Sequence, residues 1–179
     1  VVSAILTKAT IYKFYTSNIK NLSDNYLKMD KKIGLFWLRD DFRLIRNNGL
    51  SEATSKHDQV IVFHLFKKDA YKYQEAQKWW LSKSLSSFKK KLGNLNINLE
   101  IVETDSFKFF FEKFVKKKDF TIYWNKVYEP DYLKFDEYLI KTFKNKGINY
   151  ERLKGNALNE IDEIKKSDST PFKVFTPFW

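Results

Sequence analysis

The sequence is poor in the residues that build metal centres, disulfides and phosphate-binding loops. It contains no cysteine, which excludes a disulfide framework and a thiolate metal site. Its two histidines, His57 and His64, lack ligand-like spacing, so we expect no metal site. Only five glycines occur, and they form neither a G-x-G-x-x-G nor a Walker A sequence. A dinucleotide site or a P-loop nucleotide site is therefore weakly supported.

Long hydrophobic runs are also missing. No stretch approaches the roughly 20 apolar residues that a membrane-spanning helix needs. The first residues do not show the basic segment followed by an apolar core that marks a secretory signal. We therefore expect a cytoplasmic protein without a membrane partner.

Basic residues outnumber acidic ones, 33 to 22, and the net charge is +11. One interpretation is attraction to nucleic acid through its phosphates, which does not depend on base sequence. The other is compositional drift, because Lys, Asn, Ile, Phe and Tyr are all abundant, as an AT-rich genome would produce. The lysines are scattered along the chain rather than striped, and both interpretations stay open.

The 179 residues suit one domain with flanking segments. Residues 1–30 show no clear period and are expected to be an extension, with Met29 as the hypothesised natural start. Residues 31–165 are expected to form the domain. Residues 166–179 close with the stiff, aromatic stretch PFKVFTPFW, which we expect to begin a connection to a further domain. On this interpretation the chain is a fragment of a longer protein.

Short apolar runs alternate with helical patterns from residue 33 onward. This alternation predicts an α/β fold, a doubly wound, five-stranded parallel sheet with helices on both faces, Rossmann-like or flavodoxin-like. Asn47 or Asn48 is expected to cap the first helix, and Gly93 to follow the second in a C′ position. The expected strands are 33–38, 59–66, 99–102, 120–124 and 150–153, and the expected helices are 48–56, 74–92, 107–114 and 130–146.

Two polar clusters follow the first and fourth expected strands. They are residues 37–43 (WLRDDFR) and 124–130 (WNKVYEP). Ligands of open parallel sheets bind beyond the carboxyl ends of the strands, at the switch point of strand order. Because strands one and four often flank that point, the clusters can line one crevice suited to a planar polar ligand.

A structural alternative accompanies each of these residues. Arg39 and Asp41 can form a local ion pair, the tryptophans can be core residues, and Glu129 can interact with a helix dipole. His57 is expected in a solvated loop. His64 lies in a buried strand and is expected to be a hydrogen-bonded core residue rather than a catalyst.

Four segments, in order, resemble motifs of the DNA photolyase/cryptochrome family. Together they run in register over residues 33–179 and cover the family's N-terminal α/β, antenna-binding domain, while residues 1–28 lie outside. The segments are 37–44 with Asn47 and Leu50, resembling W-F-R-x-D-L-R-L-x-D-N-x-A-L; 78–85, resembling R-W/F-x-L-x-x-S-L; 124–130, resembling W-N-x-x-Y-E-P with Asp136 following at the usual distance; and 171–178, resembling P-Y-x-V-F-T-P-F.

The resemblance implies the N-terminal domain of a light-driven DNA-repair flavoprotein, a deoxyribodipyrimidine photo-lyase, which is a carbon–carbon lyase. In that family FAD and most contacts to UV-damaged DNA belong to a helical C-terminal domain, so no catalytic residue is expected in residues 1–179. The full-length protein is expected to be a monomer. The alternatives are a cryptochrome-like blue-light photoreceptor or signalling module and an unrelated nucleotide-binding α/β domain.

The resemblance also implies an antenna pigment, a folate, a deazaflavin or a flavin, in the crevice. The sequence departs from the antenna signatures at Val127 and at Asp131-Tyr132, and Arg46-Asn47 replaces the family's D-N, so the identity of the pigment stays open. The candidate pigment-binding residues are Arg39, Asp41, Asn125, Glu129, Asp131 and Tyr132. The candidate domain-interface residues are Lys173, Phe175, Thr176 and Phe178.

Overall fold

The computed structural model describes residues 33–67, 75–114, 120–155, 157, 159–160 and 164–174. The elements alternate between strand and helix as the periodicity predicts, and no bound differs from the expected one by more than two residues. In chain order they are β1 (Ile33–Leu38), α3 (Asn48–Lys56), β2 (Gln59–Lys67), α4 (Glu75–Gly93), β3 (Asn98–Thr104), α5 (Phe107–Phe114), β4 (Phe120–Asn125), α6 (Pro130–Lys146) and β5 (Asn149–Leu153).

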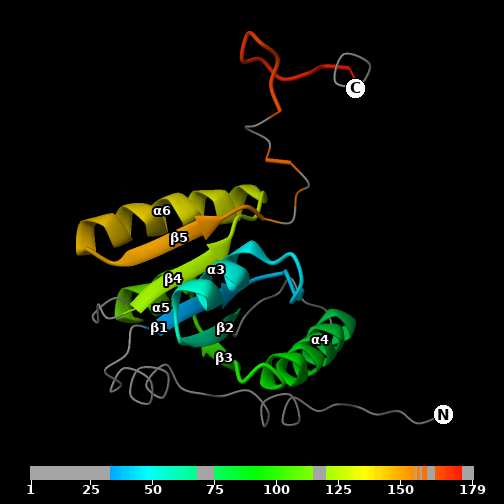
Figure 1. Cartoon of the computed structure of the whole chain (residues 1–179), viewed down its shortest axis with the longest axis vertical. Coiled ribbons are helices and arrows are strands. Elements are labelled where there is room, and N and C mark those ends of the chain that lie inside the picture. The colour runs from blue at the N-terminus through cyan, green and yellow to red at the C-terminus, as the bar shows by residue number, and fades with distance from the viewer. Residues whose placement is uncertain are drawn as a thin grey trace, which may run out of the picture.

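The strands form one five-stranded sheet in the order β3-β2-β1-β4-β5, and every pairing is parallel. The order reverses between β1 and β4, so these two strands flank the switch point of a doubly wound sheet. Figure 1 shows α6 beside β5 at one end of the sheet and α4 beside β3 at the other. The predicted fold class is confirmed.

Two hydrophobic clusters cover the two faces of the sheet. One joins side chains of the strands to α5 and α6, through residues such as Phe110, Phe111 and Phe143. The other joins them to α3 and α4, through Leu50 and Phe88. Every residue of β1 is buried, as a strand covered on both faces requires. The expectation that Trp37 and Trp124 are core residues is confirmed, because both are buried in the first cluster.

Capping residues explain where two of the helices begin or end. The Asn47 side chain accepts a hydrogen bond from the backbone N–H of Leu50, so Asn47 rather than Asn48 caps α3. Gly147 adopts a left-handed conformation (φ 66°) and ends α6. The expectation for Gly93 is wrong in detail. It is the last residue of α4, and the left-handed residue that follows is Asn96 (φ 57°).

Several expectations concern the termini. Residues 1–30, and the interface candidates Phe175, Thr176 and Phe178, lie outside the described residues. Lys173 is exposed, in a segment that Figure 1 shows running away from the sheet beyond the β5 side. Among the described helices, none is long and apolar enough to cross a membrane.

Candidate functional site at the carboxyl edge of β1 and β4

Both predicted polar clusters lie at the carboxyl edge of the sheet. Trp37 pairs in register with Trp124, so the residues that follow β1 and β4 emerge side by side. Parallel pairing thus brings together side chains that are more than 80 residues apart, as the hydrogen bond between Asn125 and Asp41 shows (|i−j| = 84).

Arg39, the first residue after β1, is buried and held from several directions. Its Nη1 donates to Asp136 Oδ1 at 3.0 Å, and its Nη2 donates to the backbone carbonyl of Asn125. The guanidinium carbon lies 4.9 Å from the Trp37 ring centroid and 5.1 Å from that of Tyr132. Burial lowers the pKa of Arg39, and the Asp136 carboxylate opposes that shift. Arg39 therefore connects the end of β1 to the end of β4 and to α6 through buried contacts.

Asp136, on α6, is fully buried and forms ion pairs with two arginines. Besides the contact with Arg39, its Oδ2 lies 3.5 Å from Nη1 of Arg152 on β5. One carboxylate thereby joins the end of β1, α6 and β5. Sequence reasoning noticed Asp136 only through the family motif and missed Arg152, whose role depends on which strand lies beside β4.

Asn125 bridges the two clusters. Its Oδ1 accepts from the backbone N–H of Gly49 at 2.7 Å, while its Nδ2 donates to Asn47 Oδ1 at 2.8 Å and to Asp41 Oδ2 at 3.3 Å. Asn47 in turn donates to the carbonyl of Arg43 at 2.9 Å. This amide chain ties the end of β4 to the first turn of α3 and fixes the β1–α3 loop.

Gly49 makes that bridge possible. A Cβ at this position would lie 2.6 Å from the Phe36 ring and 2.7 Å from Asn125 Oδ1. Any side chain would therefore push Asn125 away from the start of α3. Gly49, in the first turn of α3, therefore serves close packing rather than a phosphate.

The suggested local ion pair between Arg39 and Asp41 is wrong. Arg39 pairs with Asp136 instead, and Asp41 pairs with Arg43, whose Nε lies 2.6 Å from Asp41 Oδ1. Asp41 is only two residues from Arg43, and the loop turns its carboxylate towards that neighbour. The buried guanidinium of Arg39 therefore pairs with a carboxylate of α6, that of Asp136.

The remaining candidates lie at the start of α6. Glu129 is the N-cap residue but makes no side-chain capping bond, and Asp131 stands in the first turn. Both are exposed, and among the described residues no hydrogen bond or ion pair reaches either carboxylate. Tyr132 is half-buried, with its ring against the Arg39 guanidinium. The two carboxylates are therefore available to a ligand that donates hydrogen bonds.

A second group of contacts fixes the β4–α6 loop from the other side. Glu160 is buried, and its carboxylate accepts from Lys126 Nζ at 3.1 Å and from the Tyr128 hydroxyl. Burial tends to raise the pKa of Glu160, but the hydrogen bonds from Tyr128 and Lys126 outweigh it and hold the pKa below its ordinary value. Sequence reasoning missed Glu160, because nothing in its neighbourhood marks a buried carboxylate.

The two histidines are structural. His64 is buried, and its Nδ1 lies 3.0 Å from the carbonyl oxygen of Leu38, so the predicted core role is confirmed. His57 lies in the expected loop between α3 and β2 but is half-buried rather than fully solvated, because its ring packs edge-on against Tyr123 and its Nε2 lies 3.0 Å from the Tyr123 hydroxyl. The small Gly34 leaves room for the imidazole, since a Cβ there would lie 2.9 Å from His57 Cδ2.

Fold and site together define a doubly wound α/β domain with a hydrogen-bonded polar cluster at its switch point and exposed carboxylates beside it. The family model for DNA photolyase matches residues 34–179. The chain belongs to the DNA photolyase family.

Named relatives agree with this assignment. The chain is 27% identical over 145 residues to a deoxyribodipyrimidine photo-lyase of Agrobacterium fabrum, covering 81% of this chain and 30% of that protein. It is 26% identical over 156 residues to Cryptochrome-2 of Arabidopsis thaliana, covering 86% of this chain and 25% of that protein. The chain thus spans less than a third of the length of these curated relatives.

Solved structures show the same fold. A bacterial class III photolyase from Agrobacterium tumefaciens matches with a TM-score of 0.71 and 26% identity, covering 84% of this chain and 31% of that chain. An archaeal photolyase from Sulfolobus tokodaii matches with a TM-score of 0.62 and 23% identity, over 82% of this chain and 33% of that chain.

Proposed function

We propose that this chain is the N-terminal, antenna-bearing α/β part of a light-driven DNA-repair flavoprotein that repairs UV-induced pyrimidine dimers. The observation that carries the proposal is the family match over residues 34–179, which includes both polar clusters at the carboxyl edge. Residues 31–165 would form the domain, and 166–179 the start of the connection to a helical FAD domain. The FAD and the contacts to damaged DNA would belong to that other domain.

The side chains at the edge of the sheet are compatible with an antenna pigment. Glu129 and Asp131 would accept hydrogen bonds from it, and the Tyr132 ring would supply a flat contact. Arg39, Asp41 and Asn125 would act indirectly, because their polar atoms already hold the loops in place. When bound, the pigment, whether a folate, a deazaflavin or a flavin, would absorb light and pass the energy to FAD.

The test of the enzyme activity uses a longer polypeptide that carries the C-terminal domain and FAD. Blue light should remove dimers from UV-irradiated DNA, while the same sample in the dark should not. The 179-residue chain alone should remove none. Dimer loss by that chain alone, or none by the flavin-loaded polypeptide in light, would overturn the proposal.

The antenna role has its own test. Glu129→Gln with Asp131→Asn should reduce the amount of pigment that copurifies, while repair driven by direct excitation of FAD is retained. An unchanged pigment-to-protein ratio would remove these residues from the site.

A cryptochrome-like photoreceptor is the second candidate, favoured by the similarity to Cryptochrome-2. It predicts light-driven reduction of FAD without dimer loss. Measuring both in one flavin-loaded sample separates the two functions.

A further inference from the structure

The amphipathic helix α4 carries two tryptophans outside its buried face. Its buried face is formed by Leu85, Phe88 and Leu92, which pack in the cluster that α4 shares with the sheet. Trp79 and Trp80, by contrast, are 44% and 67% exposed. Solvent-facing positions of an amphipathic helix normally hold polar side chains, so two large indoles there break the local pattern.

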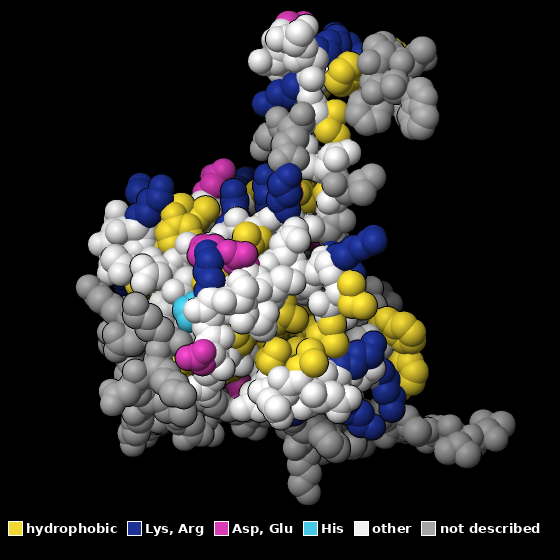
Figure 2. Space-filling model, in the orientation of Figure 1, with side chains coloured by type: hydrophobic (Ala, Val, Ile, Leu, Met, Phe, Trp, Pro, Cys, Tyr) yellow, Lys and Arg dark blue, Asp and Glu magenta, His cyan; other side chains and the backbone are white. Residues whose placement is uncertain are grey.

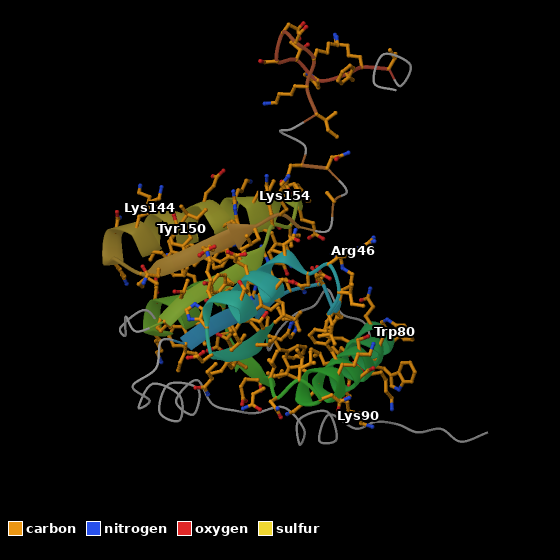
Figure 3. The ribbon with its side chains drawn as sticks, in the orientation of Figure 1. Arg46, Trp80, Lys90, Lys144, Tyr150 and Lys154 are labelled. Carbon is orange, nitrogen blue, oxygen red and sulfur yellow. The ribbon has the colours of Figure 1, made fainter. Side chains whose placement is uncertain are left out.

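Lysines share this exposed face. At 100° per residue, Lys83 and Lys90 fall on one stripe with Trp79, and Lys91 falls beside Trp80. After Glu75 the helix contains no carboxylate at all. Figure 2 shows dark blue and yellow side chains gathered over α4, and Figure 3 shows Trp80 and Lys90 pointing away from the sheet. The lysines that look scattered in the sequence are thus partly gathered by the fold.

The two rings stand close enough to act together. Their centroids are 6.1 Å apart with planes at 37°, and Lys83 Nζ lies 5.7 Å from the Trp79 ring centroid. From Trp79 to Lys91 the exposed face, here called the Trp–Lys face, runs for about 18 Å. It offers flat surfaces at one end and positive charges along its length.

We propose that the Trp–Lys face binds single-stranded nucleic acid. Unpaired bases can stack on exposed indoles, and phosphates are attracted by lysines without any reading of sequence. The choice of nucleic acid as the bound anion rests on the proposed function. The site itself lies on α4, apart from the candidate pigment residues on the β1–α3 loop, at the end of β4 and at the start of α6.

Other occupants fit the face less well. A membrane-surface helix needs a free, continuous apolar face, whereas the apolar face of α4 is already packed against the sheet. A second copy of the chain placed against this face would bring lysines against lysines. A nucleic acid satisfies both the rings and the charges.

The experiment measures binding of a fluorescent oligo(dT) by anisotropy over a series of salt concentrations, in the dark and without pigment. The wild-type chain should bind, and Trp79→Ala with Trp80→Ala should weaken binding roughly 10-fold or more for each indole that stacks on a base. Lys83→Gln, Lys90→Gln and Lys91→Gln together should reduce the slope of log K against log salt by about 2. An oligo(U) arm distinguishes DNA from RNA as the preferred strand.

Matched controls lie on the opposite face of the sheet. Lys141→Gln, Lys144→Gln and Lys146→Gln on α6 remove the same charge, and Phe109→Ala on α5 removes another exposed ring (39% exposed). If these controls weaken binding as much as the α4 variants, net charge alone explains it and the proposal is overturned. It is also overturned if the tryptophan variants bind like wild type, or if no binding is seen at low salt. Because no light is used, these failures leave the repair test untouched.

Discussion

Arg39 and Asp136 form a buried ion pair between residues 97 positions apart, with Nη1 and Oδ1 separated by 3.0 Å. The pair joins the end of β1 to α6, and the Arg39 guanidinium carbon lies 5.1 Å from the ring centroid of Tyr132, one of the candidate site residues. Removing one partner would leave the other charge buried and uncompensated, which costs more than the pair contributes.

Asp136→Leu should therefore lower the free energy of unfolding by about 3–5 kcal/mol, measured by urea denaturation. The double variant with Arg39→Met should lose less than Asp136→Leu alone, because it removes both charges. Equal losses in the single and double variants would show that the ion pair is not what holds α6 to β1.

The Asn125 bridge makes a second prediction. Asn125→Ala leaves the Gly49 N–H and Asn47 Oδ1 without this partner in a buried site, and should cost about 1–3 kcal/mol. Asn125→Asp should cost at least as much, since it replaces the amide donor by a carboxylate facing Asp41. Thermal and urea unfolding measure both, and a stable Asp variant would argue against the assigned amide orientation.

Arg46 is a non-glycine residue with a positive φ of 58°, which an arginine adopts at a cost. The family motif has Asp here, a residue that tolerates this conformation more readily. Arg46→Asn should raise the free energy of unfolding by about 1 kcal/mol. Ile45→Asn, at an exposed neighbour whose φ is not positive, should give no such gain and serves as the control.

His64 should make the protein less stable in mild acid. Burial lowers its pKa to about 4, from an ordinary value of 6.5, and the hydrogen bond with the Leu38 carbonyl opposes this only partly. Between these two values the unfolded chain binds a proton that the folded chain does not. Stability should therefore fall as the pH drops through this window, by at most about 1.4 kcal/mol per pH unit.

His64→Gln keeps a donor for the Leu38 carbonyl but cannot titrate, so its stability should depend less on pH between 6.5 and 4. Urea denaturation at several pH values provides the comparison. Parallel curves for the two proteins would contradict the buried, neutral histidine.

Glu160 should control the conformation of the β4–α6 loop. Tyr128→Phe and Glu160→Gln should speed hydrogen exchange of the Lys126 amide, which donates to the Leu153 carbonyl at 2.9 Å. The effect should also depend on pH, because the pKa of Glu160 is depressed in the folded chain. Its contribution to stability is present above the pKa of the unfolded chain and is lost as the pH falls through the pKa of the folded chain. Exchange at Phe143 and Leu139 on α6, away from the loop, serves as the internal reference.

Local sequence anticipated the elements well because their signals are local. The fully apolar run of β1, the helical spacing of Leu85, Phe88 and Leu92, and the glycine at 147 each act within a few residues. The rule that ligands of parallel sheets bind beyond the carboxyl ends of the strands at the switch point predicted the sheet edge on which the polar clusters meet. The ion-pair partner of Arg39 was not predictable from local sequence. Arg39 pairs with Asp136 rather than with Asp41 because the fold packs α6 near the end of β1.

The sequence alone determined a cysteine-free, basic α/β chain whose alternating apolar patterns specify strands, helices and membership of a family. Tertiary structure decided which charges are buried, which carboxylates at the start of α6 are exposed, and which lysines share a face with Trp79 and Trp80. The physical reason is that periodicity depends on neighbours along the chain, whereas burial and ion pairing depend on neighbours in space. Those are set by strand order and by the few glycines, such as Gly49, that allow close approach.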